Sequence, residues 1–345
     1  VTTNSICQGI QVSAMWPAIF KEGVHISFAY QPFKWANLAS HNAGVTVSII
    51  GMSKSISKRK IFNLDNAGIL TLKEVNNINA YLVPSDNIFV LPKNKVEDDR
   101  SIMQFGNHPY YGNELMLRPT EARRLLKKHP EVFGIIRPLY GSREFILNSP
   151  RSCIWISEET KENALGYQEI RERVKKVEFE RKSKKKDIQA QKLALTPYKF
   201  RDQYEAREHL IIVPIVSSES RQFLPVGVVD ARAIVHNKAF ALYDAPLWNM
   251  SIIASSLHIA WIGTVCGRLE MRFSYSNTLG WNTFPLPLLT KKNKDDLTKC
   301  AEEILIARER HFPATIADLY DPEKMPEDLR QAHERNDEVL ERIYI

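Results

Sequence analysis

Residues 239–267 read AFALYDAPLWNMSIIASSLHIAWIGTVCG and join a β-rich run to a long uncharged segment. From Ala245 to Gly267 there are 23 residues without a charge, about the length that a bilayer-spanning helix needs. An asparagine, a histidine and several serines and threonines interrupt this segment, and it has no basic flank. We therefore expect a buried helix, with Asp244 as its N-cap and Pro246 in its first turn. This pattern favours a globular α/β protein without a membrane partner.

The composition is that of an ordinary globular protein. The chain has 345 residues and a mass of 39.7 kDa, which suggests two or three domains. Hydrophobic residues make up 44% and charged residues 25%, so disorder over the whole length is excluded. The 47 lysines and arginines exceed the 40 acidic residues, giving a net charge of +7 and a pI near 9.1. This excess has the right sign for a polyanionic partner, although alone it identifies none.

The cysteines and the N-terminal residues bear on the compartment. The cysteines lie far apart and form no C-x-x-C pair, which argues against a disulfide framework or a zinc ribbon and favours a reducing cytoplasm. The first residues, VTTNSICQGIQV, have no basic region followed by an apolar one, so we expect no signal peptide. They lack an initiator Met and have the pattern of a chain that starts inside a domain.

Three regions follow from the helix and strand patterns. Residues 1–57 have too few elements to bury both faces of a sheet, so we expect the end of a larger α/β domain, followed by a basic linker, SKSISKRK, over 53–60. Residues 58–288 predict a mixed α/β domain, and residues 289–345 predict a helical segment. Helices outside the uncharged segment are expected over residues 7–21, 120–128, 158–195, 292–311 and 326–343.

The pattern over residues 158–195 becomes strongly basic. Between Arg171 and Lys186 there are nine basic residues and three glutamates. One interpretation is a solvated helix face, and the other is a surface that follows the phosphates of a nucleic acid. The sequence leaves both open.

Local catalytic motifs are missing from the sequence. It contains no P-loop, no G-x-S-x-G elbow, no H-E-x-x-H and no other closely spaced set of metal ligands. No Gly-rich nucleotide loop follows a strand, and the carboxylates form no nuclease-type cluster. We expect no metal site and no complete catalytic apparatus in this chain.

Three stretches resemble the MmeI-like (type IIL) restriction–modification enzymes, whose methyltransferase is of the γ type that modifies adenine N6. TTNSICQGIQVSAMWPAIF and SFAYQPFKWANLASHNAGVTVSIIG resemble the closing motifs of that catalytic domain. IRPLYGSREFI, LIIVPIVSSESRQFLPVG, AFALYDAPLW and GRLEMRFSYSNTLGWNTFPLP are similar to the target-recognition domain. TIADLYDPEKMPEDLRQAHERNDEVLERIY is similar to the C-terminal helical segment. In the family's order, these stretches span nearly the whole chain.

The resemblance implies a remnant of a Rossmann-like methyltransferase domain (1–57), a mixed α/β target-recognition domain (58–288) and a C-terminal helical segment (289–345), from a bacterial restriction–modification system. The intact protein would transfer a methyl group from S-adenosylmethionine to an adenine in double-stranded DNA. The family's Gly-containing cofactor motif and its Asn/Asp-Pro-Pro-aromatic motif, both expected upstream of TTNSICQG, are absent from this sequence. We therefore expect this chain to bind no S-adenosylmethionine and to be inactive. Its partners would be DNA and the N-terminal catalytic domain, with any nuclease domain, of the same polypeptide.

Two aromatic residues are candidates for holding a flipped-out target base. Methylation of an adenine in a duplex requires that the base leave the stack and be held by stacking. Gln31–Trp35, QPFKW, lies where the family carries its last catalytic-domain motif, so Phe33 or Trp35 would be the stacking face. The alternative is that both rings pack the edge of the sheet. Asn4 and Ser5 either line the same pocket or cap the following helix.

The run RLEMR, residues 268–272, is the candidate for base readout. On a strand its alternation would place Arg268, Glu270 and Arg272 on one face. Arginine can bind guanine through two hydrogen bonds, and glutamate can accept from the cytosine amino group. One strand could then recognise a C·G pair, and the family's recognition domain also places specificity residues in this stretch. The alternative is a surface ladder of ion pairs.

Other cations are candidates for contacts with the DNA backbone, which position a protein without specifying sequence. Arg143 and Arg221 lie in polar, turn-like loops beside expected strands. The basic helix contributes four lysines, Lys182, Lys184, Lys185 and Lys186.

We therefore expect sequence-specific DNA recognition within an adenine-N6 methyltransferase. One alternative is a stand-alone DNA-binding specificity subunit that borrows a catalytic partner, which the start inside a motif argues against. Another is a helical module that binds protein. It would bind nucleic acid without the steep salt dependence that several phosphate contacts produce.

Overall fold

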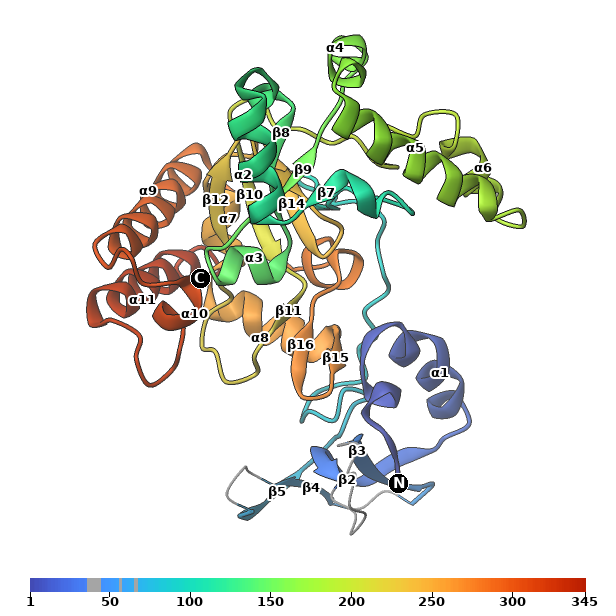
Figure 1. Ribbon diagram of the computed structural model, residues 1–345. Coiled ribbons are helices and arrows are strands. Elements are labelled where there is room, and N and C mark those ends of the chain that lie inside the picture. Colours follow the sequence, from blue (N-terminus) through green and yellow to red (C-terminus); the bar gives the residue numbers. More distant parts are fainter. Residues whose placement is uncertain (36–44, 56–57, 65–67) are drawn as a thin grey trace.

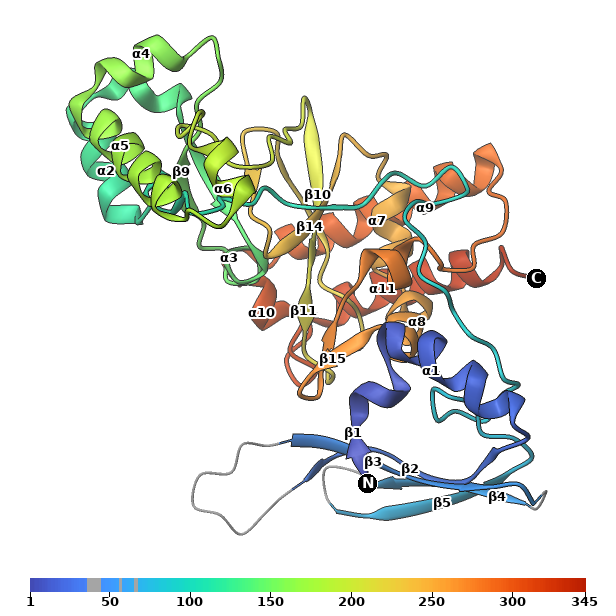
Figure 2. The same ribbon diagram turned by 90° about the vertical axis from the view of Figure 1, so that its right-hand side faces the viewer.

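The computed structural model describes residues 1–35, 45–55, 58–64 and 68–345 (Figure 1). Helices accompany four separate sheets, which confirms the mixed α/β class. A first unit with one sheet, a central unit that includes the C-terminal helices, and a helical arm make up the molecule (Figure 2). Residues 56–57 of the expected linker lie outside the described residues.

The first unit is a five-stranded sheet with a helix on one face. Its strand order is β1-β3-β2-β4-β5, and among these described strands only β2 and β4 are parallel neighbours. Val12 and Trp16 of helix α1 share a buried core with Ala29 and Ile61 of the sheet. The elements are β1 Thr2–Thr3, α1 Gly9–Lys21, β2 His25–Trp35, β3 Val45–Ser53, β4 Arg59–Leu64 and β5 Leu70–Val75.

The sheet of the first unit extends past residue 57, and the linker expected over 53–60 is wrong. Strand β4 begins at Arg59 and pairs in parallel with β2. Ile61 of β4 is buried, as are Ile78 and Leu82 beyond the last strand. Arg59 and Lys60 hide the apolar alternation that would have indicated a strand, although Arg59 is buried on the same side as Ile61 and Lys60 is exposed.

The central unit is a four-stranded antiparallel sheet, ordered β12-β10-β14-β6, covered by helices. Ile211 and Val213 of β10 share one core with Leu297 and Ile304 of the C-terminal helices. The two long helices expected over 292–311 and 326–343 are confirmed, and they complete the core of the central sheet. The elements are β6 Gln104–Phe105, β10 His209–Pro214, β12 Gly227–Asp230, β14 Ala239–Tyr243, α9 Lys291–Glu309, α10 Ile316–Leu319 and α11 Glu327–Glu341.

The uncharged segment forms two helices, α7 Trp248–Ile253 and α8 Ser256–Val265, where one was expected. The Oγ of Ser255 accepts the N–H of His258, so this serine caps a new helix. Asp244 is not an N-cap, because its carboxylate accepts N–H groups from residues 207–209 across the sheet edge. Every residue of α7 is buried. Within the described ranges, no helix is long and apolar enough to cross a membrane.

The arm joins a second small sheet, ordered β13-β8-β9-β7, to a group of helices. The helix expected over 158–195 is divided into α4, α5 and α6. Asp187 begins α6 by accepting the N–H of Ala190 at 3.0 Å, which separates it from α5. The elements are β7 Met116–Leu117, α2 Pro119–Lys128, β8 Ile136–Tyr140, α3 Ser142–Ile146, β9 Arg151–Ile154, α4 Lys161–Gly166, α5 Gln168–Ser183, α6 Ile188–Leu193 and β13 Ile234–Val235.

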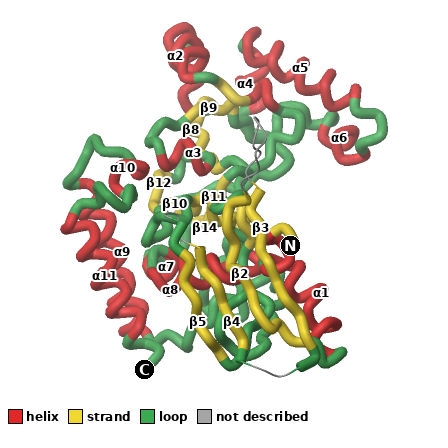
Figure 3. Tube along the Cα trace, turned by 90° about the horizontal axis from the view of Figure 1, so that it is seen from below, coloured by secondary structure: helices red, strands yellow, loops and turns green. Residues whose placement is uncertain are grey.

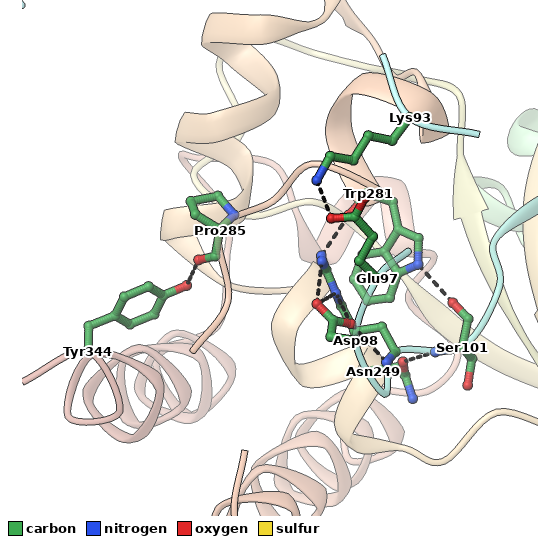
Figure 4. Close-up of polar contacts among 9 residues, drawn as sticks. Lys93, Glu97, Asp98, Ser101, Asn249, Trp281, Pro285 and Tyr344 are labelled. Atoms are coloured by element: carbon green, nitrogen blue, oxygen red, sulfur yellow. Dashed lines mark hydrogen bonds and ion pairs between the residues drawn. The ribbon is translucent and has the colours of Figure 1, made fainter. Parts of the chain in front are cut away.

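Arg100 fixes the irregular segment that leads from the first unit to the central sheet. Its guanidinium donates to Asp98 at 2.7–3.0 Å and to the carbonyl of Trp281 at 2.6 Å. The Trp281 indole donates in turn to the carbonyl of Ser101, whose N–H donates to Asn249 (Figure 4). Because these bonds join residues far apart in sequence, the segment is tied to the helices beneath it.

Arg181 fastens α5 to the rest of the arm. Its side chain is fully buried, and burial lowers its pKa to about 10. No carboxylate in the described part of the chain lies within ion-pair distance of it. It donates instead to five backbone carbonyls at 2.8–3.3 Å, those of Pro109, Tyr110, Leu193, Thr196 and Lys199.

Replacing Arg181 with methionine should lower the free energy of unfolding by about 3 kcal/mol or more, because buried carbonyls lose their donor. Lys182→Met is the control, since Lys182 is exposed and pairs only with Glu178, an interaction worth under about 0.5 kcal/mol. Urea denaturation measures both losses, and hydrogen exchange should locate the first in α5 and α6. Equal, small losses in the two variants would contradict the anchoring role of Arg181.

Candidate nucleic-acid interface

A hairpin occupies the place where a single readout strand was expected. Strands β15 and β16 pair antiparallel, and Glu270 and Met271 form the two-residue turn between them. The expectation that Arg268, Glu270 and Arg272 share one strand face is therefore wrong. The turn was hidden because Glu270 has a φ of 58°, a conformation usually signalled by glycine or asparagine. The strands of this third sheet are β11 Val216–Ser217, β15 Gly267–Leu269 and β16 Arg272–Ser274.

Arg268 holds the hairpin together. Its guanidinium donates to the carbonyl of Met271 at 2.8 Å and to that of Gly263, in α8, at 3.2 Å. It also lies over the Phe273 ring, with its central carbon 4.7 Å from the ring centroid. Burial lowers the pKa of Arg268. These contacts make Arg268 a support of the hairpin and remove it from the tip.

Glu270 and Arg272 lie exposed at the hairpin tip. An Oε of Glu270 and an Nη of Arg272 are 3.0 Å apart, with about half or more of each side chain exposed. An ion pair this exposed contributes little to stability, so both groups can exchange it for other partners. The tip therefore presents one acceptor and one donor side by side.

The hairpin lies against the first unit. A Cβ on Gly9, at the start of α1, would lie 3.8 Å from the backbone nitrogen of Gly267, where β15 begins. The hydroxyl of Thr46 in β3 is 3.6 Å from the sulfur of Met271 in the turn. Sequence reasoning missed this junction, and its one signal was the glycine at position 9, which begins α1 and has a φ of 60° in the structure.

Phe33 and Trp35 lie inside strand β2, near its end. They project from the same face, with ring centroids 6.3 Å apart, and Trp35 is 44% exposed. Asn4 and Ser5 do not cap α1, because its N-cap residue is Gln8 and no side chain bonds to the helix end. Ser5 bonds instead to the hydroxyl of Thr3.

The two candidate arginines differ in environment. Arg143 lies in helix α3 and not in a loop, and its exposed guanidinium bonds to no described residue. Arg221 is half-buried beside the hairpin sheet, and its guanidinium donates to the hydroxyl of Ser217 at 3.2 Å. Burial lowers the pKa of Arg221.

Two of the four candidate lysines on the arm are free. Lys182 pairs with Glu178 at 2.5 Å, and Lys184 lies over the Tyr111 ring at 5.0 Å. Lys185 and Lys186, in the turn between α5 and α6, are exposed and form no ion pair with any residue that the structure describes.

The arm and the first unit extend to the same side of the central unit, one above and one below the hairpin (Figure 1). Seen from below, the end of β2 and the start of β3 point toward the arm (Figure 3). The candidate base-reading, base-holding and lysine groups thus belong to three parts around one side of the molecule. In the described ranges, no three His, Cys, Asp or Glu side chains are placed to hold a metal ion.

Comparisons with known proteins agree with one another. The chain matches "MmeI, DNA-methyltransferase domain" over residues 1–63, "MmeI, target recognition domain" over 84–288 and "MmeI, C-terminal domain" over 289–345. DNA methyltransferase A of Bacillus subtilis (strain 168) is 39% identical over 345 residues, all of this chain and 39% of that protein. A solved structure of the type IIL restriction–modification enzyme MmeI in complex with DNA matches with a TM-score of 0.92 and 31% identity, over 99% of this chain and 46% of that one. The chain thus spans less than half the length of either relative.

The two arginines of the hairpin should differ in their effect on stability. Arg268→Met should lower the free energy of unfolding by about 1–3 kcal/mol, because two carbonyls lose a charged donor. Arg272→Met should change it by less than about 0.5 kcal/mol, since it removes one exposed ion pair. Thermal and urea unfolding of both variants measure the contrast. If both substitutions cost the same, Arg268 does not support the hairpin.

Proposed function

The chain belongs to the MmeI family, and we propose that it selects the DNA sequence at which a restriction–modification adenine-N6 methyltransferase acts. The observation that carries this proposal is the hairpin tip, where Glu270 and Arg272 are adjacent and exposed, and where their ion pair contributes little to stability. Glutamate accepts from the cytosine amino group, and arginine donates to guanine O6 and N7. Because Arg268 bonds to the carbonyls of Met271 and Gly263, the tip can enter a groove of the DNA and keep its shape.

Contacts with the DNA backbone come from the arm and the central unit in this proposal. Lys185 and Lys186 offer charges without a protein partner among the described residues, while Lys182 and Lys184 are partly engaged by Glu178 and Tyr111. Arg143, in α3 of the arm, and Arg221, in the central unit, add two more cations. Such contacts set the position and register of the duplex and leave sequence choice to the hairpin.

The base to be methylated is received by the first unit. Trp35 offers an exposed ring at the end of β2, and Phe33 lies beside it on the same face. A ring of this kind can stack on a base that has left the duplex. The hairpin touches the same unit through Thr46, which links the choice of sequence to the place where the base is held.

The methyl transfer itself belongs to a longer polypeptide, with S-adenosylmethionine as the methyl donor. Cofactors of open α/β sheets bind at the carboxyl ends of adjacent parallel strands. The described strands of the first unit include one such pair, β2 and β4, but the Gly-containing motif that holds the cofactor in the family is absent from this sequence, so these residues do not fit it. This chain alone binds no S-adenosylmethionine and does not methylate.

The rest of the methyltransferase domain packs on the open face of the first sheet. The face opposite α1 carries Phe28, Leu64, Leu70 and Leu72, which are between 36% and 53% exposed. Tyr30 stacks on Phe62 on that face, with centroids 4.5 Å apart. A largely apolar sheet face left open to water favours a covering layer.

Exchanging the charges of the tip (Glu270→Lys with Arg272→Asp) should change the preferred base at one position of the bound site, because donor and acceptor are exchanged. The measurement is selection of bound duplexes from a randomised pool at about 100 mM salt. An exposed pair between the C-terminal helices, Glu303 and Arg335, supplies the matched control (Glu303→Lys with Arg335→Asp), which should leave the selected motif unchanged. A motif unaltered by the tip exchange would remove Glu270 and Arg272 from base readout.

Replacing Lys185 and Lys186 together with glutamine should weaken binding about equally for all sequences. It should reduce the slope of log K against log salt concentration by about 0.9 for each phosphate that these lysines neutralise. Lys299→Gln on α9 is the control and should leave the slope unchanged. Binding titrations between about 50 and 200 mM salt measure the slopes. A wild-type chain without steep salt dependence would favour the protein-binding alternative.

A further inference from the structure

A pocket of about 420 Å³ lies where the first unit meets the hairpin. From the first unit, Cys7 and Gln8 line it just ahead of helix α1, together with Gln31 of β2. From the central unit, Arg221 and Arg268 line it. The pocket therefore lies at the contact between the part that recognises sequence and the part that receives the target base.

The two arginines of this pocket lack a matching negative charge. Neither guanidinium has a carboxylate within 4 Å among the described residues, and Glu219 and Asp321 act on them only at longer range. Both side chains are half-buried, and each uses a minority of its five N–H groups in the bonds described above. Withdrawing two cations from water without a counter-ion is unfavourable, so this pocket favours an anion.

The first unit adds donors to the same pocket. Gln8 is 7% exposed, and its buried Nε2 has no acceptor among the described residues. Gln8 is also the N-cap residue of the 13-residue helix α1, which has no side-chain cap and no acidic residue in its first turn. The N-terminus of such a helix carries a partial positive charge and free N–H groups, and both attract anions.

We propose that this pocket binds one phosphate group of the DNA backbone, held by Arg221, Arg268, Gln8 and the start of α1. The proposal rests on the DNA-binding function proposed above and adds a site to it. A phosphodiester accepts hydrogen bonds at its unbridged oxygens and carries the negative charge that the two arginines lack. Because its donors come from both units, one bound phosphate would fix the hairpin relative to α1.

This assignment gives the hairpin's supporting arginine a second role. Arg268 keeps the tip in shape through two carbonyls and directs remaining N–H groups toward a phosphate. Glu270 and Arg272, only a few residues along the hairpin, would then meet bases close to that phosphate. The register of the tip along the duplex is set by the pocket, and base identity is read by the tip.

The decisive variant is Gln8→Glu, which places a carboxylate of nearly the same shape beside the two arginines. DNA affinity at about 100 mM salt should fall about tenfold or more, because the new charge occupies or repels the phosphate position. The DNA-free variant should unfold at a higher temperature than the wild type, because the arginines gain a counter-ion. Arg221→Gln, at a half-exposed position, should weaken DNA binding in the same direction without that rise. Gln331→Glu on α11 is the charge-matched control and should do neither.

Inorganic phosphate separates this proposal from the function on which it rests. At constant ionic strength, phosphate should raise the unfolding temperature of the wild type above that in chloride, and Gln8→Glu should abolish the difference. A wild-type protein that binds no DNA would refute the proposed function, and the unfolding measurements with phosphate would still test whether the pocket binds an anion. If phosphate stabilises the wild type but Gln8→Glu binds DNA normally, the site takes free phosphate and the assignment to the backbone fails. If Gln8→Glu and Arg221→Gln both bind DNA with the affinity and the salt dependence of the wild type, the proposal is wrong.

Discussion

Buried guanidinium groups that donate to backbone carbonyls hold the irregular parts of this protein in place. Arg100 ties the segment after the first unit to the carbonyl of Trp281, Arg181 gathers five carbonyls of the arm, and Arg308 joins the C-terminal helices to the carbonyl of Val226. A carbonyl removed from water must find a donor, and loops cannot provide one from a regular ladder. Arginine suits this task because its five N–H groups reach several acceptors at once. Three connections that lack regular pairing are fixed in this way.

The same arrangement in the hairpin separates the residue that supports its shape from the residues proposed to recognise bases. Arg268 bonds to the turn and to α8, so the shape of the hairpin does not depend on the side chains at its tip. Glu270 and Arg272 bond only to each other among the described residues, in water, and their mutual attraction is weak. A substitution at the tip changes what the surface offers to a base at little cost in folding. A substitution at Arg268 changes the presentation of the whole surface.

The elements that the sequence predicted well are those whose own apolar pattern determines them. The buried uncharged segment and the two C-terminal helices followed from composition and helical spacing, because the core selects such residues directly. The linker expected over 53–60 was wrong because basic residues hid the start of strand β4. The single helix expected over 158–195 was wrong because Asp187, within the helical pattern, is the N-cap of a separate helix, α6. The hairpin turn could not be predicted, since its positive φ belongs to Glu270 and not to the glycine or asparagine that usually signals such a turn. The candidate readout residues nevertheless follow from their chemistry and the family resemblance, which do not depend on the strand assignment.

The junction between the two units would couple the proposed sequence recognition to the proposed binding of the target base. Gly9, at the start of α1, lies so close to Gly267 at the base of the hairpin that a Cβ on Gly9 would be in van der Waals contact with it, and the Thr46 hydroxyl is 3.6 Å from the sulfur of Met271 in the turn. The packing between the two units is incomplete, because it surrounds a pocket. Arg221 and Arg268, which line this pocket, have no carboxylate within 4 Å among the described residues. Those cations keep the junction incompletely neutralised until an anion enters. In the proposed phosphate site, the duplex would be both the molecule whose sequence is read and the component that completes the interface.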